Sequence, residues 1–251
     1  MTSEDYIYGL RAVLEAVQAG KDIDKILIKK DLQGELVSLL LSEARHRHLL
    51  VLRVPAEKLN RITRANHQGV IAMLAAVTYS RVGELVPRLY EDGILPLVVV
   101  LDGLTDVRNF GAIARTAECA GANALVIPER GSVSAGADAM KTSAGALSYL
   151  TVCRERNLAA AVRYLKDNGY RVVACTEKAD CNYTLADYTA PTAIVMGAED
   201  TGISAEIMEL CDSRVAIPMF GHIGSLNVSV AAGVLLYEVV RQRLNADMEV
   251  M

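Results

Sequence analysis

From Leu95 onward, short apolar segments alternate with segments of helical spacing, and this alternation strongly constrains the fold. Strands are expected at Leu97–Leu101, Ala124–Ile127, Arg171–Cys175, Ala193–Met196 and Arg214–Ile217. Helices are expected at about Phe110–Ala120, Asn157–Asn168, Ile203–Cys211 and Val228–Arg243. Near-continuous apolar strands separated by helices are typical of a parallel sheet that helices cover on both faces. Residues 95–251 are therefore predicted to form one α/β domain.

The first 78 residues predict a separate, smaller α/β unit. Its expected elements are a helix at Tyr8–Gly20, a strand at Asp24–Lys29, a helix at Leu36–His46, and strands at Leu49–Val54 and Val70–Val77. A unit of this length is large enough to fold alone. Residues 79–94 are more polar and contain Pro87, so they are interpreted as a helical linker. The predicted division is 1–78, 79–94 and 95–251.

Composition excludes several classes of protein. Of the 251 residues, 52% are hydrophobic and 22% are charged, which is incompatible with an intrinsically disordered chain. The apolar run Ile94–Leu101 is too short to span a bilayer, and no basic region followed by an apolar one opens the chain. Five scattered cysteines form no CxxC and no metal-ligand spacing with the four histidines. We therefore expect no metal site, reduced thiols, no membrane association and a cytoplasmic location.

A net charge of -4 argues against a strongly basic nucleic-acid-binding surface. Residues 1–78, however, carry 11 Lys and Arg against 9 Asp and Glu, whereas the remainder carries 15 against 21. The basic residues of the first part that gather in clusters are Lys29, Lys30, Arg45, Arg47, Arg61 and Arg64. They form either solvated faces or a modest RNA-binding surface.

In parallel sheets, ligands bind beyond the carboxyl ends of the strands. The polar residues that follow the predicted strands are Asp102–Asn109, Thr176, Gly197–Gly202 and Pro218–Asn227. No GxGxxG follows a strand, no GxSxG occurs, and the P-loop-like segment 136–142 lacks the glycine before its lysine. A nicotinamide enzyme, a P-loop enzyme and a serine hydrolase therefore have little support.

Three of these segments carry candidate functional residues. The first enters a helix and contains Asn109 and Arg115. The alternative to a functional role is that Asn109 is only an N-cap and Arg115 only a solvated helix residue. The second contains Glu199, whose alternative role is to cap the following helix. The third contains Ser225 and Asn227, good N-cap residues before a long apolar helix whose start attracts anions.

Taken together, the three segments resemble the SpoU (TrmH) branch of the SPOUT methyltransferases. The motif N-x-G-x-x-x-R matches Asn109, Gly111 and Arg115. The motif G-x-E-x-x-G begins at Gly197, and I-P-M…S-L-N-V-S begins at Ile217. The N-terminal segments YG…AV at 8–13 and HQGVIA at 67–72 look like those of bacterial members that methylate a guanosine 2'-hydroxyl in large-subunit (23S) ribosomal RNA. The resemblance covers nearly the whole chain.

The resemblance implies a C-terminal trefoil knot, S-adenosylmethionine as cofactor, a homodimer formed by the knotted domains, and an N-terminal domain resembling an RNA-binding ribosomal protein. The implied cofactor-binding residues are Thr176, Gly197, Glu199, Gly202, Ile217, Met219, Ser225 and Leu226. The implied catalytic residues are Asn109, Arg115, Glu199, Ser225 and Asn227.

The implied reaction transfers a methyl group from a sulfonium to a ribose hydroxyl. The resemblance assigns Arg115 as the base, but a guanidinium stays protonated below a pKa of about 12. A cation that holds a phosphate and the developing alkoxide is the expected role. Transfer RNA is the rival substrate, and a non-catalytic RNA-binding module and a nucleotide-dependent oxidoreductase are the rival classes.

The apolar helix at the end of the chain is also expected to form the dimer interface. The residues assigned to that interface are Val228, Ala231, Val234, Leu235, Val239 and Val240. Their apolar surface exceeds what one side of a covering helix uses. The alternative is that all of it is internal core.

Overall fold

The computed structural model describes residues 5–179 and 181–250. The chain separates into two compact units. The first comprises the residues up to Thr78 together with Ser134–Asp138, and the second comprises Tyr79–Val133 and the chain from Ala139 onward.

The N-terminal unit contains a four-stranded sheet of order β1-β4-β2-β3. Its strands are β1 (Tyr6–Tyr8), β2 (Ile23–Lys29), β3 (Leu50–Val54) and β4 (Val70–Leu74). β2 and β3 are parallel, and β4 is antiparallel to both β1 and β2. The first three strands therefore run in one direction, and their carboxyl ends meet at one edge of the sheet.

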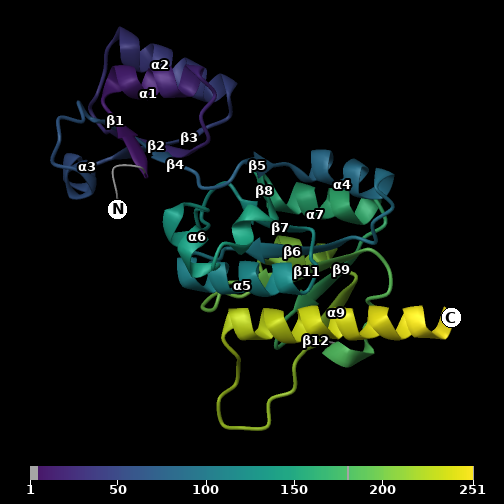
Figure 1. Cartoon of the computed structure of the whole chain (residues 1–251). Coiled ribbons are helices and arrows are strands. Elements are labelled where there is room, and N and C mark those ends of the chain that lie inside the picture. Colours follow the sequence, from purple (N-terminus) through teal and green to yellow (C-terminus); the bar gives the residue numbers. More distant parts are fainter. Residues whose placement is uncertain (1–4, 180, 251) are drawn as a thin grey trace. The chain divides into compact units, whose positions relative to one another are not determined.

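Helices cover both faces of this small sheet (Figure 1). The alternation along β2 sends Ile26 and Ile28 toward α1 (Leu10–Gln18) and α2 (Glu35–His46), and sends Leu27 toward α3 (Ala56–Ile62). The predicted elements are confirmed except that β1 and α3 were not expected. Both are short, and α3 buries only one side chain, so neither produces a clear periodic pattern.

The second unit contains an eight-stranded sheet of order β10-β12-β9-β11-β6-β7-β8-β5, in which every adjacent pair is parallel. Its strands are β5 (Tyr79–Ser80), β6 (Leu97–Asp102), β7 (Ala124–Pro128), β8 (Thr151–Glu155), β9 (Arg171–Cys175), β10 (Cys181–Asn182), β11 (Thr192–Gly197) and β12 (Ser213–Ala216). The α/β class and the five predicted strands are confirmed. Strand β8 was missed because its sequence, TVCRE, is half polar, and β5 and β10 are two-residue edge strands.

Helices pack on both faces of the large sheet (Figure 1). One apolar cluster joins β6, β7, β9 and β11 to α4 (Val82–Glu91), α7 (Leu158–Asp167) and α8 (Ala205–Leu210). On the opposite face, α5 (Val107–Cys119) packs against α9 (Val228–Val250). The remaining short helices are α6 (Ala137–Thr142), η1 (Ala146–Ser148) and η2 (Tyr183–Leu185).

The stretch 79–94, expected as a linker, is part of the second unit. Its first two residues add β5 to the sheet, and α4 buries Val82, Leu85, Val86 and Leu89 in the core. These positions follow the i, i+3, i+4, i+7 spacing of an amphipathic helix. The polar residues of α4 form its solvent face and do not mark a domain boundary.

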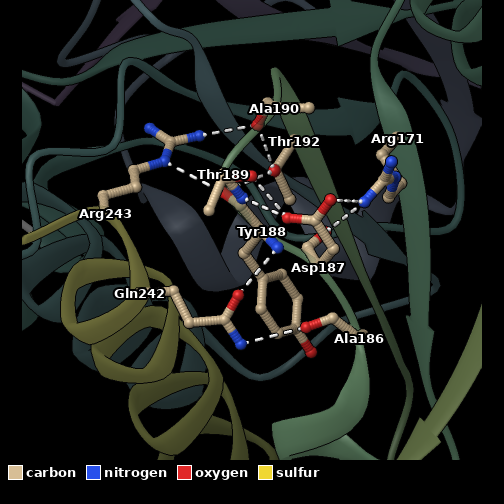
Figure 2. Close-up of polar contacts among 9 residues, drawn as sticks. All are labelled: Arg171, Ala186, Asp187, Tyr188, Thr189, Ala190, Thr192, Gln242 and Arg243. Carbon is tan, nitrogen blue, oxygen red and sulfur yellow. Dashed lines mark hydrogen bonds and ion pairs between the residues drawn. The ribbon is translucent and has the colours of Figure 1, made fainter. Parts of the chain in front are cut away.

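The far end of α9 is tied to the segment that leads into β11 (Figure 2). Gln242 accepts a hydrogen bond from the backbone N–H of Tyr188 and donates one to the carbonyl of Ala186, both at 3.0 Å. Arg243 donates to the carbonyls of Tyr188, Ala190, Leu95 and Pro96. These bonds join the last turns of α9 to the segments that lead into β6 and β11, so they fix α9 to the sheet.

The expectation that six apolar residues of α9 form a dimer interface is wrong for most of them. Val228, Ala231, Leu235 and Val239 are buried within the chain itself, because α9 covers a sheet face and also contacts α5. Among the side chains of α9 that the structure describes, the exposed apolar ones are instead Val230, Tyr237, Leu244 and Met248. No helix of residues 5–179 and 181–250 is both long and apolar enough to span a membrane.

Candidate active site

The three polar segments meet at the carboxyl edge of the large sheet. Asn109 lies on the first turn of α5, after β6. Glu199 lies in the loop that leaves β11, and Asn227 immediately precedes α9. Because β6 and β11 are adjacent parallel strands, the loops that follow them emerge side by side.

Asp106 caps α5 and leaves Asn109 free for the site. Asp106 Oδ1 accepts hydrogen bonds from the backbone N–H groups of Arg108 at 2.7 Å and Asn109 at 3.1 Å. These bonds lower the pKa of the Asp106 carboxyl below its ordinary value. Asn109 is therefore not the N-cap.

Asn109, Glu199 and Asn227 form a closed hydrogen-bonded group. Glu199 Oε1 accepts from Asn109 Nδ2 at 3.1 Å and from Asn227 Nδ2 at 2.6 Å. Asn227 Nδ2 also donates to Asn109 Oδ1 at 3.0 Å. Each amide group thus has one orientation that satisfies the network, with its NH2 toward the carboxylate.

Ser229 fixes the amide of Asn227 from the opposite side. Asn227 Oδ1 accepts from the Ser229 backbone N–H at 3.0 Å and from Ser229 Oγ at 2.5 Å. Asn227 therefore acts as the N-cap of α9, as expected, and presents its amide nitrogen to Glu199. Ser225, the other candidate cap, does not have this role.

Glu199 is bound to the start of α9. Its Oε1 lies 3.5 Å from the Val228 backbone nitrogen, where the helix carries a partial positive charge. The alternative that Glu199 caps the next helix is wrong, because Ser204 is the N-cap residue of α8 and its backbone N–H donates to Asp102 Oδ2 at 2.7 Å.

The loop 197–202 needs both of its glycines. Ala198 and Gly202 form an antiparallel backbone pair at 2.9 and 3.2 Å, and Gly202 has a φ of 69°. A Cβ atom at Gly197 would overlap the backbone of Gly202 and Ile203. The loop itself therefore excludes a side chain at residue 197, independently of any ligand.

A cavity of about 840 Å³ opens beside this network. All eight residues expected to bind the cofactor line it: Thr176, Gly197, Glu199, Gly202, Ile217, Met219, Ser225 and Leu226. Asn227 lines it as well. The volume lies within the range of small-molecule sites.

The chemistry of the walls fits S-adenosylmethionine. Met196, Ile217, Met219 and Leu226 provide apolar surface for a nucleoside, and the loop 197–202 exposes backbone at the carboxyl end of β11. Glu199, Ser225 and Asn227 add hydrogen-bonding side chains to the same cavity. This combination suits an amphipathic cofactor.

Arg115 is not brought into the site by this chain. It is exposed on α5, does not line the cavity, and within residues 5–179 and 181–250 it makes no hydrogen bond or ion pair. The structure therefore gathers four of the five candidate catalytic residues at the cavity or in its network.

Three further residues support the site, and the sequence did not predict roles for them: Asp102, Asp106 and Ser229. The features of the sequence that could have indicated them are the two carboxylates at and after the end of β6 and the serine two residues after Asn227.

Two family models match the chain, in the same order as the two units. The model described as "SpoU rRNA Methylase family" matches residues 96–237, which is more than half of the chain. The model described as "RNA 2'-O ribose methyltransferase substrate binding" matches residues 6–80.

The chain belongs to the SpoU family of RNA methyltransferases.

This SpoU family chain is 38% identical over 240 residues to a protein named as a TrmH family tRNA/rRNA methyltransferase of Staphylococcus saprophyticus, with 96% of each chain covered. A solved AdoMet-bound rRNA methyltransferase of Sinorhizobium meliloti is 26% identical, with a TM-score of 0.58 over 94% of this chain and 87% of that one. The A. aeolicus TrmH/SpoU tRNA modifying enzyme is 31% identical, with a TM-score of 0.55 over 66% of this chain and 86% of that one. SpoU methyltransferases use S-adenosylmethionine, so the cavity's fit to that cofactor agrees with the family.

Proposed function

We propose that this SpoU family protein methylates the 2'-hydroxyl of a guanosine in large-subunit ribosomal RNA. The observation that carries the proposal is the Asn109–Glu199–Asn227 network beside a cavity that all eight expected cofactor-binding residues line. The match of residues 6–80 to a model of 2'-O ribose methyltransferase substrate binding supports the ribose hydroxyl as acceptor.

When bound, S-adenosylmethionine supplies an electrophilic methyl group, so the protein's main task is positioning. Correct alignment of the reacting groups contributes at most about 7–11 kcal/mol. Glu199 holds both asparagine amides, and these in turn hold the first turn of α5 against the start of α9. The network therefore orders the loops that surround the acceptor hydroxyl.

The acceptor hydroxyl must lose its proton, and the negative charge that develops needs a cation. Arg115 is free of protein partners among the described residues, which suits a guanidinium that contacts an RNA phosphate and the developing alkoxide. We assign it that role and not that of a base. To Ser225, which lines the cavity, we assign the role of orienting the substrate.

The extent of the structural matches favours ribosomal RNA over transfer RNA. The solved rRNA methyltransferase matches 94% of the chain, which includes the N-terminal unit. The solved tRNA modifying enzyme matches 66% of it, about the length of the second unit. A unit shared with an rRNA enzyme supports selection of ribosomal RNA, and from that substrate we infer a cytoplasmic location.

We also propose that the second unit forms a homodimer and contains a trefoil knot. Val230, Tyr237 and Leu244 are more than half exposed and repeat every seven residues, so they lie along one face of α9. A helix that buries one side in its own chain and exposes an apolar stripe on another suits pairing with a second copy. The proposal of a knot is based on family membership. An experimental structure that traces the backbone through residues 213–250 would test it.

The test is transfer of a labelled methyl group from S-adenosylmethionine to RNA from cells that lack this protein. Large-subunit rRNA, small-subunit rRNA and tRNA are offered separately, and the modified site is mapped as a 2'-O-methyl nucleotide. We expect one guanosine of large-subunit rRNA to be modified. Methylation of tRNA alone would contradict the substrate, and cofactor binding without transfer to any RNA would contradict the enzyme.

A further inference from the structure

We propose that the N-terminal unit binds RNA at one end only, the edge where the carboxyl ends of β1, β2 and β3 meet. We call it the carboxyl edge and define it by Tyr8, Arg11, Lys29, Lys30, Asn66 and Gln68. The inference rests on the proposed function, because it takes RNA as the substrate, and it names the part of the unit that contacts that RNA.

The fold separates the basic residues that the sequence groups together. Lys29 ends β2 and Lys30 follows it, and Arg61 and Arg64 precede the start of β4 at the same edge. Arg45 and Arg47 lie instead at the end of α2, because each helix begins where its preceding strand ends and runs back. Two groups of cations therefore lie at opposite ends of the unit.

At the opposite end of the unit, several groups already make contacts within the protein. Arg47 donates to the carbonyl of Gln18, where α1 ends, at 2.8 Å. Asp24 accepts from Ser134 Oγ at 2.5 Å, and the backbone of Ala76 bonds to that of Ala135. The segment 134–138 thus covers part of this end, and Arg47 already binds a backbone carbonyl of the unit.

The carboxyl edge is open and hollowed. A depression of about 510 Å³ is lined by the edge residues Tyr8, Arg11, Asn66 and Gln68. Tyr8 is 42% exposed, a large fraction for an aromatic residue. An aromatic face, a guanidinium and two side-chain amides therefore surround one hollow.

The loop that forms one wall of this hollow is held in a costly conformation. Gln68 has a φ of 52°, rare for a residue with a side chain, and its Oε1 accepts from the Leu10 backbone N–H at 3.1 Å. His67 Nδ1 accepts from Gly69 N–H at 3.0 Å, and its Nε2 bonds to Asn60 Oδ1 at 2.9 Å. Strain of this kind persists where surrounding contacts enforce it and gathers at binding sites.

These groups match RNA that exposes an unpaired base. Lysine and arginine bind phosphates, an exposed tyrosine ring stacks on a splayed base, and amides bond to base edges. Asp31 and Glu35 also lie near this edge, but Arg11, Lys29 and Lys30 outnumber them. The expected ligand is therefore a loop or bulge of RNA, because a regular duplex offers no unstacked base.

The experiment compares two charge-matched double variants of the full-length protein. Lys29→Gln with Lys30→Gln removes two cations from the carboxyl edge, and Lys21→Gln with Arg45→Gln removes two from the opposite end. All four side chains are exposed. The probe is an unmodified in vitro transcript of large-subunit rRNA, and binding is measured by filter retention over a range of salt concentrations.

We expect the edge variant to bind about tenfold more weakly, with a salt slope smaller by about 1.4 since two phosphate contacts are lost. The control should change less than twofold. Tyr8→Leu should weaken binding by about tenfold with little change in the slope, because stacking is not ionic. Equal losses in both double variants, or none in the edge variant, would overturn the inference.

Methyl transfer by the wild type to the same transcript separates the two proposals. If the wild type modifies this RNA and the edge variants bind it normally, the inference fails while the proposed function stands. If the wild type binds but modifies no RNA, the proposed function fails. Binding loss confined to the edge variants would still support the carboxyl edge as the RNA contact.

Discussion

Asn227 and Glu199, 28 residues apart in the chain, are joined by a hydrogen bond of 2.6 Å between Nδ2 and Oε1. The same oxygen accepts from Asn109, which lies 90 residues before Glu199. One carboxylate oxygen therefore fixes two loops and two helix starts. Because every donor in the group is an amide N–H, the network works only while residue 199 is an acceptor.

Glu199→Gln should lower the rate of methyl transfer by about 100-fold, comparable with the loss of one preorganised hydrogen-bonding group. The carbonyl oxygen of glutamine can still accept both hydrogen bonds, but without the negative charge these bonds and the contact with the start of α9 weaken, so the loops lose their alignment. Single-turnover transfer measures the effect. Asp200→Asn is the matched control, because Asp200 is the adjacent exposed carboxylate on the same cavity. Equal losses in the two variants would show that charge and not the network matters.

Arg115→Ala should lose about 100-fold or more in transfer rate with a change in stability within about 0.5 kcal/mol, as at other surface positions. Arg115→Lys keeps the charge but not the planar fork, so it tests geometry separately. Arg108→Ala, an exposed arginine on the same helix, is the control. Near-normal transfer by Arg115→Ala would refute the assigned role.

Gly197→Ala should lose both cofactor binding and stability, because the added Cβ displaces the backbone of Gly202 and Ile203. A cost of about 1–3 kcal/mol is expected for overpacking. Calorimetry with S-adenosylmethionine and thermal melting measure the two effects. Gly221→Ala is the control, since a Cβ atom there meets nothing within 4 Å. An unchanged melting temperature would contradict the packing argument.

Asp187→Asn should lower the free energy of unfolding at pH 7 by less than about 1 kcal/mol, because the carboxylate of Asp187 is half exposed. Hydrogen bonds from Thr189 and the ion pair with Arg171 lower the pKa of Asp187 to about 2 (Figure 2). A lowered folded-state pKa contributes stability above the unfolded value, near 3.9, and that stability is lost as pH falls toward 2. Urea unfolding should show the difference from wild type shrinking between pH 4 and 2. A difference that does not depend on pH would exclude the ion pair as its source.

Tyr237→Glu should shift the protein toward a monomer, because it places a charge in the exposed apolar stripe of α9. Sedimentation equilibrium at micromolar concentration measures the mass. Tyr149→Glu is the control, since Tyr149 is 85% exposed and lies outside α9. A wild-type protein that is monomeric and active would contradict the dimer.

The sequence by itself determined the α/β class, the predicted strands and the order of the three motifs. Apolar runs such as Leu97–Leu101 can only be buried, and the periodicities 2 and 3.6 separate strand from helix. It also placed Thr176, Gly197–Gly202 and Pro218–Asn227 at one edge, because the residues that follow parallel strands lie there, and the family resemblance indicated the individual cofactor-binding residues. These properties follow from local residue spacing and from the order of the strands, both of which the sequence contains.

The tertiary structure decided what depends on distance between segments. Only the fold shows that Gly197 touches Gly202, that Ser229 orients Asn227, and that α4 belongs to the core. It also divided cations that look alike in sequence, placing Lys29 and Arg45 at opposite ends of one sheet. The physical reason is that side-chain contacts and edges of a sheet arise from the packing of distant elements, which residue spacing alone does not encode.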